Sequence, residues 1–225
     1  MYAIIIKIYK TYHEAFSQYL VFGKEIIMNT VITIAREYGS GGRIIGQKLA
    51  EILGFSFYDK ELIEMAAEKI GFSTDYVREN EEKKMFSFLS NFYGVSGELP
   101  ASDQIFIAQS GVIKEIASRE NCVIVGRCAD YVLSDNPNCL NIFIHAPIEE
   151  RARRVFEEYD EDAPNLMAYI MKVDKKRASY YNYMTQNKWG KADNYHLSIN
   201  STLGIDLTVS MIKAAVDEFR KKREK

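Results

Sequence analysis

Residues suited to binding metals or to forming disulfides are scarce in this sequence. Its 225 residues include three cysteines and three histidines. Cys122, Cys128 and Cys139 are odd in number and lack the spacing of metal ligands, so we interpret them as reduced thiols of a cytosolic protein. The histidines lie far apart and form no motif, which indicates structural roles. We therefore predict no metal site formed by protein side chains alone.

A strong excess of either charge is also missing. The sequence has 29 lysines and arginines against 31 aspartates and glutamates, a net charge of −2. This balance argues against broad electrostatic attachment to nucleic acid or to a membrane surface. No apolar run is long enough to span a bilayer. We expect a cytoplasmic protein whose partner is a small molecule, and neither a nucleic acid polymer nor a membrane.

What the sequence does have is a glycine-rich stretch between a strand pattern and a helix pattern. The β-branched run at 31–34 predicts a buried strand, and the apolar stripe Ile44, Ile45, Leu49, Ile52 and Leu53 predicts a helix. Glycines allow the backbone to approach an anion, and the helix start attracts it through free amides and its dipole. We therefore expect phosphate to bind at Gly39, Ser40, Gly41, Gly42 and Arg43.

The loop departs from both glycine motifs that it resembles. A Walker A motif has a lysine for the phosphates and then a hydroxyl residue for Mg²⁺. Gly42 stands where the lysine would stand, no serine or threonine follows it, and Arg43 is the only cation in the loop. A dinucleotide fingerprint needs its third glycine where Ile44 stands. An oxidoreductase that places Asp59 on a ribose nevertheless stays an alternative, because Asp59 follows the first glycine at about the right distance.

Strand and helix patterns alternate along the rest of the chain. We predict strands at 55–58, 121–125, 140–144 and 195–199, and helices at 60–70, 103–119, 148–159, 165–184 and 206–223. This alternation is typical of an α/β domain with a parallel five-stranded sheet covered by helices on both faces. Ligands bind at the carboxyl ends of such strands. There the sequence has the glycine loop, Asp59, Arg127 and the arginines of the 148–159 helix.

The segment order resembles the cytidylate kinase-like branch of the P-loop nucleoside monophosphate kinases. The matching segments are AREYGSGGRIIGQKLA, FYDKELI, IVGRCADYVL, IFIHAPIEERARRV and DKKRASYYNYMTQNKWGKADNYHLSIN. The resemblance implies a P-loop NTPase-type domain at 30–225, with a helical monophosphate-site insert at 59–120 and a helical lid at 150–194. Residues 1–29 differ in composition from the rest, and we interpret them as an extension, with translation starting at Met28.

The same resemblance implies an activity and roles for individual residues. The activity is phosphoryl transfer from ATP, with Mg²⁺, to a nucleoside monophosphate such as CMP. The glycine loop would bind the donor, and the acceptor would contact Asp59, Arg127 and Asp174. Stabilisation of the transferring group would fall to Arg43, Arg127, Arg151, Arg154 and Arg177.

The missing lysine leaves a second function open. Phosphoryl transfer depends mainly on positioning and on charge stabilisation, so an arginine has to replace the lysine if the protein is a kinase. Arg36 and Arg43 flank the loop and are the candidates, although arginine does not reproduce the shape of lysine. Where cytidylate kinases have an acidic residue before the glycine of the third strand, this chain has Val125. The alternative is a nucleotide- or phosphate-binding module without turnover.

Overall fold

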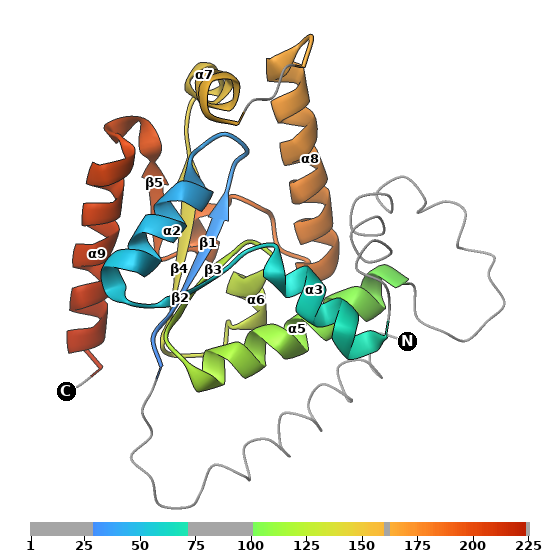
Figure 1. Ribbon diagram of the computed structural model, residues 1–225, viewed down its shortest axis with the longest axis vertical. Helices are drawn as coiled ribbons and strands as arrows, with labels where there is room; N and C mark the ends of the chain where they lie inside the picture. Colours follow the sequence, from blue (N-terminus) through green and yellow to red (C-terminus); the bar gives the residue numbers. More distant parts are fainter. Residues whose placement is uncertain (1–28, 72–100, 160–162, 224–225) are drawn as a thin grey trace, which may run out of the picture.

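A computed structural model describes residues 29–71, 101–159 and 163–223 (Figure 1). Five parallel strands form one sheet in the order β2-β3-β1-β4-β5. The strands are β1 (Val31–Arg36), β2 (Ser56–Tyr58), β3 (Cys122–Val125), β4 (Cys139–His145) and β5 (Leu197–Asn200). Residues 1–28 of the predicted extension at 1–29, and residues 72–100 of the predicted insert at 59–120, lie outside the described residues. The predicted α/β fold with a parallel five-stranded sheet is confirmed.

The central strand, β1, explains why the site forms where it does. Val31 pairs with Cys122 of β3 on one side and with Cys139 of β4 on the other. Its β-branched residues are buried, as expected for a strand covered on both faces. The glycine loop begins where β1 ends, so it lies between the loops that follow β3 and β4.

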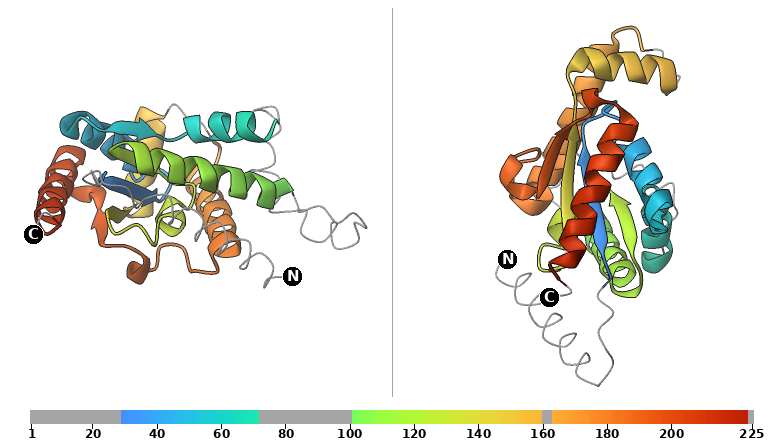
Figure 2. Two further views of the ribbon diagram at one scale, coloured as in Figure 1. Left: turned by 90° about the horizontal axis from the view of Figure 1, so that it is seen from below. Right: turned by 90° about the vertical axis from the view of Figure 1, so that its left-hand side faces the viewer.

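Helices cover both faces of the sheet (Figure 2). Alternate strand residues such as Ile32 and Ile34 pack against α2 (Gly42–Leu53) and α9 (Ile205–Lys221). On the other face, residues such as Val31 pack against α5 (Ala101–Arg119) and α6 (Ala129–Val132). The helix α3 (Glu61–Ile70) packs on α5.

Two further helices lie at the carboxyl end of the strands. Figure 1 shows α7 (Ile148–Glu158) above the sheet and α8 (Leu166–Thr185) running down beside it. The lower part of α8 is fixed to α6, because Tyr181 Oη donates a hydrogen bond to Asp130 Oδ2 at 2.7 Å. No helix within the described residues is long and apolar enough to cross a bilayer.

Most element boundaries lie close to those predicted, and the exceptions have local causes. Gly54 and Gly71 end their helices in the left-handed conformation, with φ of 65° and 68°. The helix predicted at 103–119 is observed from Ala101 to Arg119. Ile52 was assigned to the buried stripe of α2 and is 56% exposed, because the buried face of α2 is narrower than the apolar stripe.

Candidate phosphate-binding site

The glycine loop has a backbone that only glycine adopts easily. Gly39 and Gly41 both have φ of +79°, in the left-handed region. A Cβ on Gly39 would lie 2.7 Å from Val155 Cγ2 and 2.8 Å from the Arg151 carbonyl oxygen. Gly41 is the N-cap of α2 and accepts a hydrogen bond from the Ile45 amide at 2.9 Å. The preceding amides of α2 have no partner within the helix, which is the usual geometry of an anion site.

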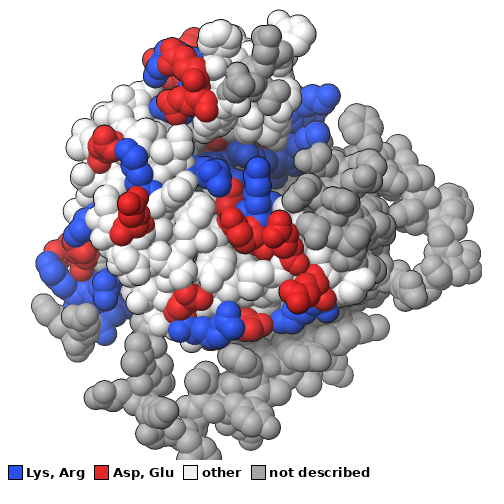
Figure 3. Space-filling view, viewed as in Figure 1, with Lys and Arg blue, Asp and Glu red and all other residues white. Residues whose placement is uncertain are grey.

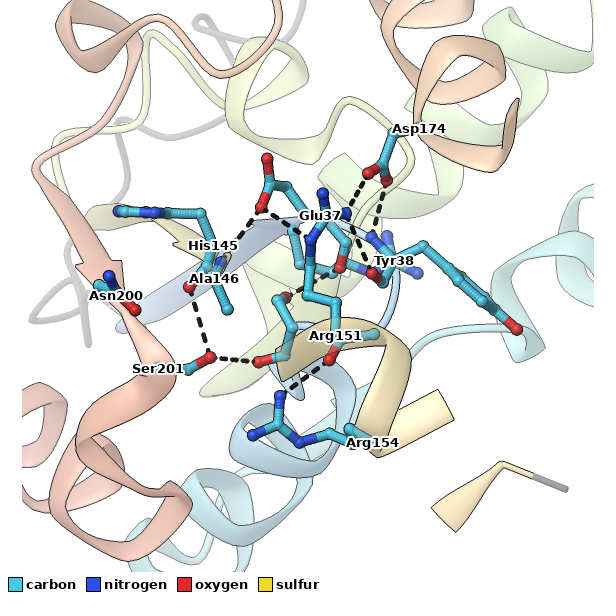
Figure 4. Close-up of polar contacts among 12 residues, drawn as sticks. Glu37, Tyr38, His145, Ala146, Arg151, Arg154, Asp174, Asn200 and Ser201 are labelled. Carbon is cyan, nitrogen blue, oxygen red and sulfur yellow. Dashed lines mark hydrogen bonds and ion pairs between the residues drawn. The ribbon is translucent and has the colours of Figure 1, made fainter. Parts of the chain in front are cut away.

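Four side chains from later parts of the chain bind carbonyl groups in this loop and just before it, and Figure 4 labels Arg151, Arg154 and Ser201 among them. We call Arg151, Arg154, Arg177 and Ser201 the loop clamp. Their contacts are Arg177 Nη1 to Arg36 O at 3.0 Å, Arg151 Nη1 to Tyr38 O at 3.2 Å, Arg154 Nη1 to Gly39 O at 2.8 Å and Ser201 Oγ to Ser40 O at 2.6 Å. In a trans peptide the next amide points away from the carbonyl. The amides of Gly39 and Gly41 follow the bound carbonyls of Tyr38 and Ser40, so they point away from the clamp.

Carboxylates hold the clamp in place. Arg151 is 7% exposed, forms an ion pair with Asp174 and lies with Nε 3.5 Å from Glu37 Oε2. Asp174 also accepts a hydrogen bond from the Tyr38 amide at 2.7 Å, and Glu37 accepts one from the Ala146 amide at 3.1 Å. The buried charge of Arg151 is thus compensated on two sides. Asp174 therefore supports the loop, both through Arg151 and through the Tyr38 amide.

A second group of charges surrounds Asp59 at the end of β2. Asp59 is 3% exposed and binds two arginines, with Arg43 Nε at 2.8 Å from Oδ2 and Arg36 Nη2 at 3.4 Å from Oδ1. Burial, and after it the positive charge of Arg177, lower the pKa of Arg36 to about 9, which leaves the group protonated at neutral pH. Arg127 adds a further positive charge nearby. These four arginines outnumber the carboxylate, so the group attracts an anion.

The surface view agrees with this arrangement. In Figure 3, basic side chains gather in the hollow below α7 and α8, and a line of acidic side chains runs along α3. The acidic line comes from the exposed residues Glu61, Glu64 and Glu68. Positive charge is therefore concentrated at the carboxyl end of the strands, where it attracts anions.

The turn after β3 carries backbone strain. Gly126, Arg127 and Cys128 have φ of 79°, 59° and 54°, so three consecutive residues are left-handed. For the two residues that have a Cβ, this conformation costs roughly 1–2 kcal/mol each. Strain of this kind persists where the surrounding structure over-determines it, and it gathers at functional sites. The turn directs Arg127 towards the charge group around Asp59 and Arg36.

Residues outside these groups have simpler roles. His196 Nδ1 accepts a hydrogen bond from the Asn141 amide at 2.9 Å, and His145 stacks on Phe143. The three cysteines are buried and form no disulfide with one another. Within the described ranges, no three His, Cys, Asp or Glu side chains gather in a way that could hold a metal.

The structure also shows site residues that sequence reasoning did not select. Glu37 and Tyr38 lie inside the loop, and Ser201 directly follows β5. Ser201 could have been found, because it stands at the carboxyl end of a predicted strand, where ligand-binding residues gather. Glu37 and Tyr38 carry no comparable signal.

The sheet order decides between the two glycine-loop families. In a classical dinucleotide-binding sheet the first strand is paired with the second. Here β1 lies between β3 and β4, and Asp59 is buried against two arginines. These observations overturn the oxidoreductase alternative. A family model described as the cytidylate kinase-like family matches residues 31–203.

The chain belongs to the cytidylate kinase-like family. Among solved structures, this family member is similar to an uncharacterized protein from Eubacterium ventriosum, with 30% identity, a TM-score of 0.63, and coverage of 84% of this chain and 99% of that one. No curated protein matches its sequence.

Two kinases of known substrate share the fold. A gluconokinase from Sinorhizobium meliloti has 13% identity and a TM-score of 0.54, covering 89% of this chain and 98% of its own. A shikimate kinase from Acinetobacter baumannii, solved in complex with shikimate, has 17% identity and a TM-score of 0.50, covering 84% and 94%. At these identities the likeness concerns the P-loop kinase fold and not the substrate.

Proposed function

We propose that this protein transfers a phosphoryl group from ATP to a nucleoside monophosphate, CMP being the first candidate. The observation that carries the proposal is the position of the glycine loop beside a group of four arginines, two of which bind one buried carboxylate, Asp59. Free loop amides suit the donor phosphates, and the arginines suit a second phosphorylated molecule. Family membership supports the nucleotide as the acceptor.

The chemistry assigned to the site is a single displacement. A phosphate oxygen of the acceptor attacks the γ-phosphorus of ATP, and the bond from that phosphorus to the β–γ bridging oxygen breaks. ADP leaves with the electron pair, and the acceptor becomes a diphosphate. Negative charge spreads over the three equatorial oxygens, so positioned cations lower the barrier.

The side chains divide into two roles. Arg36, Arg43, Arg127 and Arg177 bind phosphate oxygens, and Asp59 holds Arg36 and Arg43 in place. Arg177 has both roles, because its Nη1 also donates to the Arg36 carbonyl. Arg151 and Arg154 act as positioning residues, because each donates to a loop carbonyl and is largely buried. Asp174 in turn orients Arg151. We retain residues 150–194 as the proposed lid, of which α7 and α8 are described.

The residues present fit Mg²⁺ only as a metal that arrives with ATP. Mg²⁺ in kinase sites is held by one or two carboxylates together with substrate phosphates and water. This site offers Asp59, and no cluster of three ligating side chains occurs in the part of the chain that the structure describes. Mg²⁺ bound to ATP would neutralise charge on the donor phosphates.

A non-catalytic binding module is the second candidate. It is favoured by Gly42, which stands where the donor-binding lysine is expected. Such a module would bind ATP or a nucleoside monophosphate through the same loop and arginines, and would release no ADP.

The two candidates differ in ADP release. The full chain is incubated with Mg-ATP and with CMP, UMP, AMP or GMP in turn, and ADP is measured by enzymatic coupling. Shikimate and gluconate serve as comparison acceptors. The kinase proposal predicts ADP release that depends on one nucleoside monophosphate and falls about 10²-fold in Asp59→Asn, because two arginines lose their anchor. Thermal stabilisation by ATP without ADP release from any acceptor would select the binding module.

A further inference from the structure

Gly42 stands where a Walker A motif would have its lysine, and it packs against the side chain of Arg36. A Cβ on Gly42 would lie 2.6 Å from Arg36 Cβ and 3.0 Å from Arg36 Cγ. Gly42 is not among the glycines with positive φ, and it starts α2 as an ordinary helical residue. Its backbone therefore does not require glycine. What excludes a side chain at this position is the stem of Arg36.

From Gly42 the Arg36 side chain continues towards the ends of β2 and β3. A Cβ on Gly126 would lie 2.1 Å from Arg36 Nη1, and Nη2 lies 3.4 Å from Asp59 Oδ1. Two glycines thus leave room for one arginine. Its stem lies over Gly42 at the start of α2, and its guanidinium lies beside Gly126 and Asp59.

The charge of Arg36 is only partly compensated within the protein. Its contact with Asp59 is the longer of two, since Arg43 holds the same carboxylate at 2.8 Å. The charges of Arg177 and Arg127 oppose it, and its side chain is 19% exposed. A cation in this setting gains from a bound anion, and a guanidinium can bind two phosphate oxygens at once.

We infer that Arg36 binds the transferred phosphate in place of the missing lysine, and that Gly42 is a glycine because Arg36 passes over it. A lysine at the helix start reaches the β- and γ-phosphates in a Walker A loop. Here the cation comes from the last residue of β1 instead. The inference rests on the proposed function for its reaction, but its binding part can be tested without an acceptor.

The first test removes the charge and keeps the stem. Arg36→Met retains the packing against Gly42, and Arg153→Met removes an exposed arginine of α7 as a control for net charge. Binding of ATP and of inorganic tripolyphosphate to the full chain is measured by calorimetry. We expect Arg36→Met to weaken both at least tenfold and Arg153→Met to change neither more than twofold. Equal affinities of the two variants would overturn the inference.

The second test moves the cation from the strand to the helix. Arg36→Gly removes the Cβ that blocks position 42, so Gly42→Lys can be added to it. We expect either single substitution to weaken ATP binding at least tenfold, and the double variant to return to within threefold of the unchanged protein. The matched control combines Gly42→Lys with Arg153→Gly, which removes an arginine outside the site, leaves the Arg36 stem in place and should not recover. A double variant no better than Arg36→Gly would contradict the inference.

Failure of the inference and failure of the proposed function give different results. If the double variant recovers ATP affinity but the protein phosphorylates no acceptor, Arg36 is the donor-binding cation and the kinase proposal is refuted. Phosphoryl transfer that survives in Arg36→Met would support the kinase and refute the inference. If the double variant does not fold, the Arg36→Met comparison decides. An unchanged protein that binds neither ATP nor tripolyphosphate would refute both.

Discussion

The loop clamp can be tested by comparing two adjacent arginines of α7. Arg154 is 5% exposed, and its Nη1 donates to the Gly39 carbonyl at 2.8 Å. Arg153 is half-exposed and pairs with Glu150 and Glu157. The substitutions Arg154→Met and Arg153→Met remove the same charge from the same helix. They differ in whether a loop carbonyl loses its donor.

The two substitutions are expected to differ several-fold in how much they lower the free energy of unfolding. Loss of a hydrogen bond from a charged donor costs about 1.5–3 kcal/mol, and the Gly39 carbonyl is left without that partner. Methionine retains much of the arginine stem, so the packing contribution changes little. We expect Arg154→Met to lower the free energy of unfolding by about 2 kcal/mol. Surface pairs such as those of Arg153 contribute little to stability, because solvent screens them.

Two measurements check this expectation. In a domain of this size, about 2 kcal/mol corresponds to a melting temperature lower by roughly 4–8 °C. Hydrogen exchange should also show faster exchange in the glycine loop of Arg154→Met, and unchanged exchange there in Arg153→Met. Equal melting temperatures and equal exchange in the loop would refute the clamp, because the Gly39 contact would then contribute nothing to loop order.

Two further predictions concern backbone strain and pH. Gly41 and Gly54 both have positive φ, but a Cβ on Gly41 would meet Ile205 and Arg154, whereas one on Gly54 meets nothing within 4 Å. Both Gly→Ala variants should lose about 1–2 kcal/mol of stability, and only Gly41→Ala should bind ATP more weakly by calorimetry; equal ATP affinities would contradict the proposed loop site. Burial raises the pKa of the Asp130 carboxyl, so the folded state retains the proton longer than the unfolded state does, and stability falls as pH rises above the ordinary carboxyl range. Asp130→Asn should therefore gain stability relative to the unchanged protein as pH rises above the ordinary carboxyl range in urea unfolding, and a difference that is constant with pH would exclude this explanation.

The fold could be predicted because its signals are local. Runs of β-branched residues marked the buried strands, and glycines such as Gly54 and Gly71 marked helix ends. The glycine loop was found for the same reason, since its composition and its neighbours in sequence suffice. Ile52 shows the limit of local reasoning: apolar periodicity finds a helix but not the width of its buried face.

The site could be predicted only in part, because its contacts join distant segments. Spacing placed Arg151 and Arg154 on one helix face, but it could not show that this face meets loop carbonyls. Asp174 lies 136 residues from the Tyr38 amide that it binds. Arg36 was considered as a replacement for lysine, but its passage over Gly42 is visible only in three dimensions.

The Ser201 contact has a consequence for how the protein is made. Ser201 Oγ binds the Ser40 carbonyl across 161 residues, and it follows β5, the edge strand next to β4. A chain emerging from the ribosome presents its glycine loop early, yet that loop lacks one of its four holding contacts until Ser201 has been synthesised. Domains generally fold as units during synthesis. The first loop of the domain is therefore among the last parts to be completed, and an unfinished chain lacks the fully held loop that the proposed nucleotide site requires.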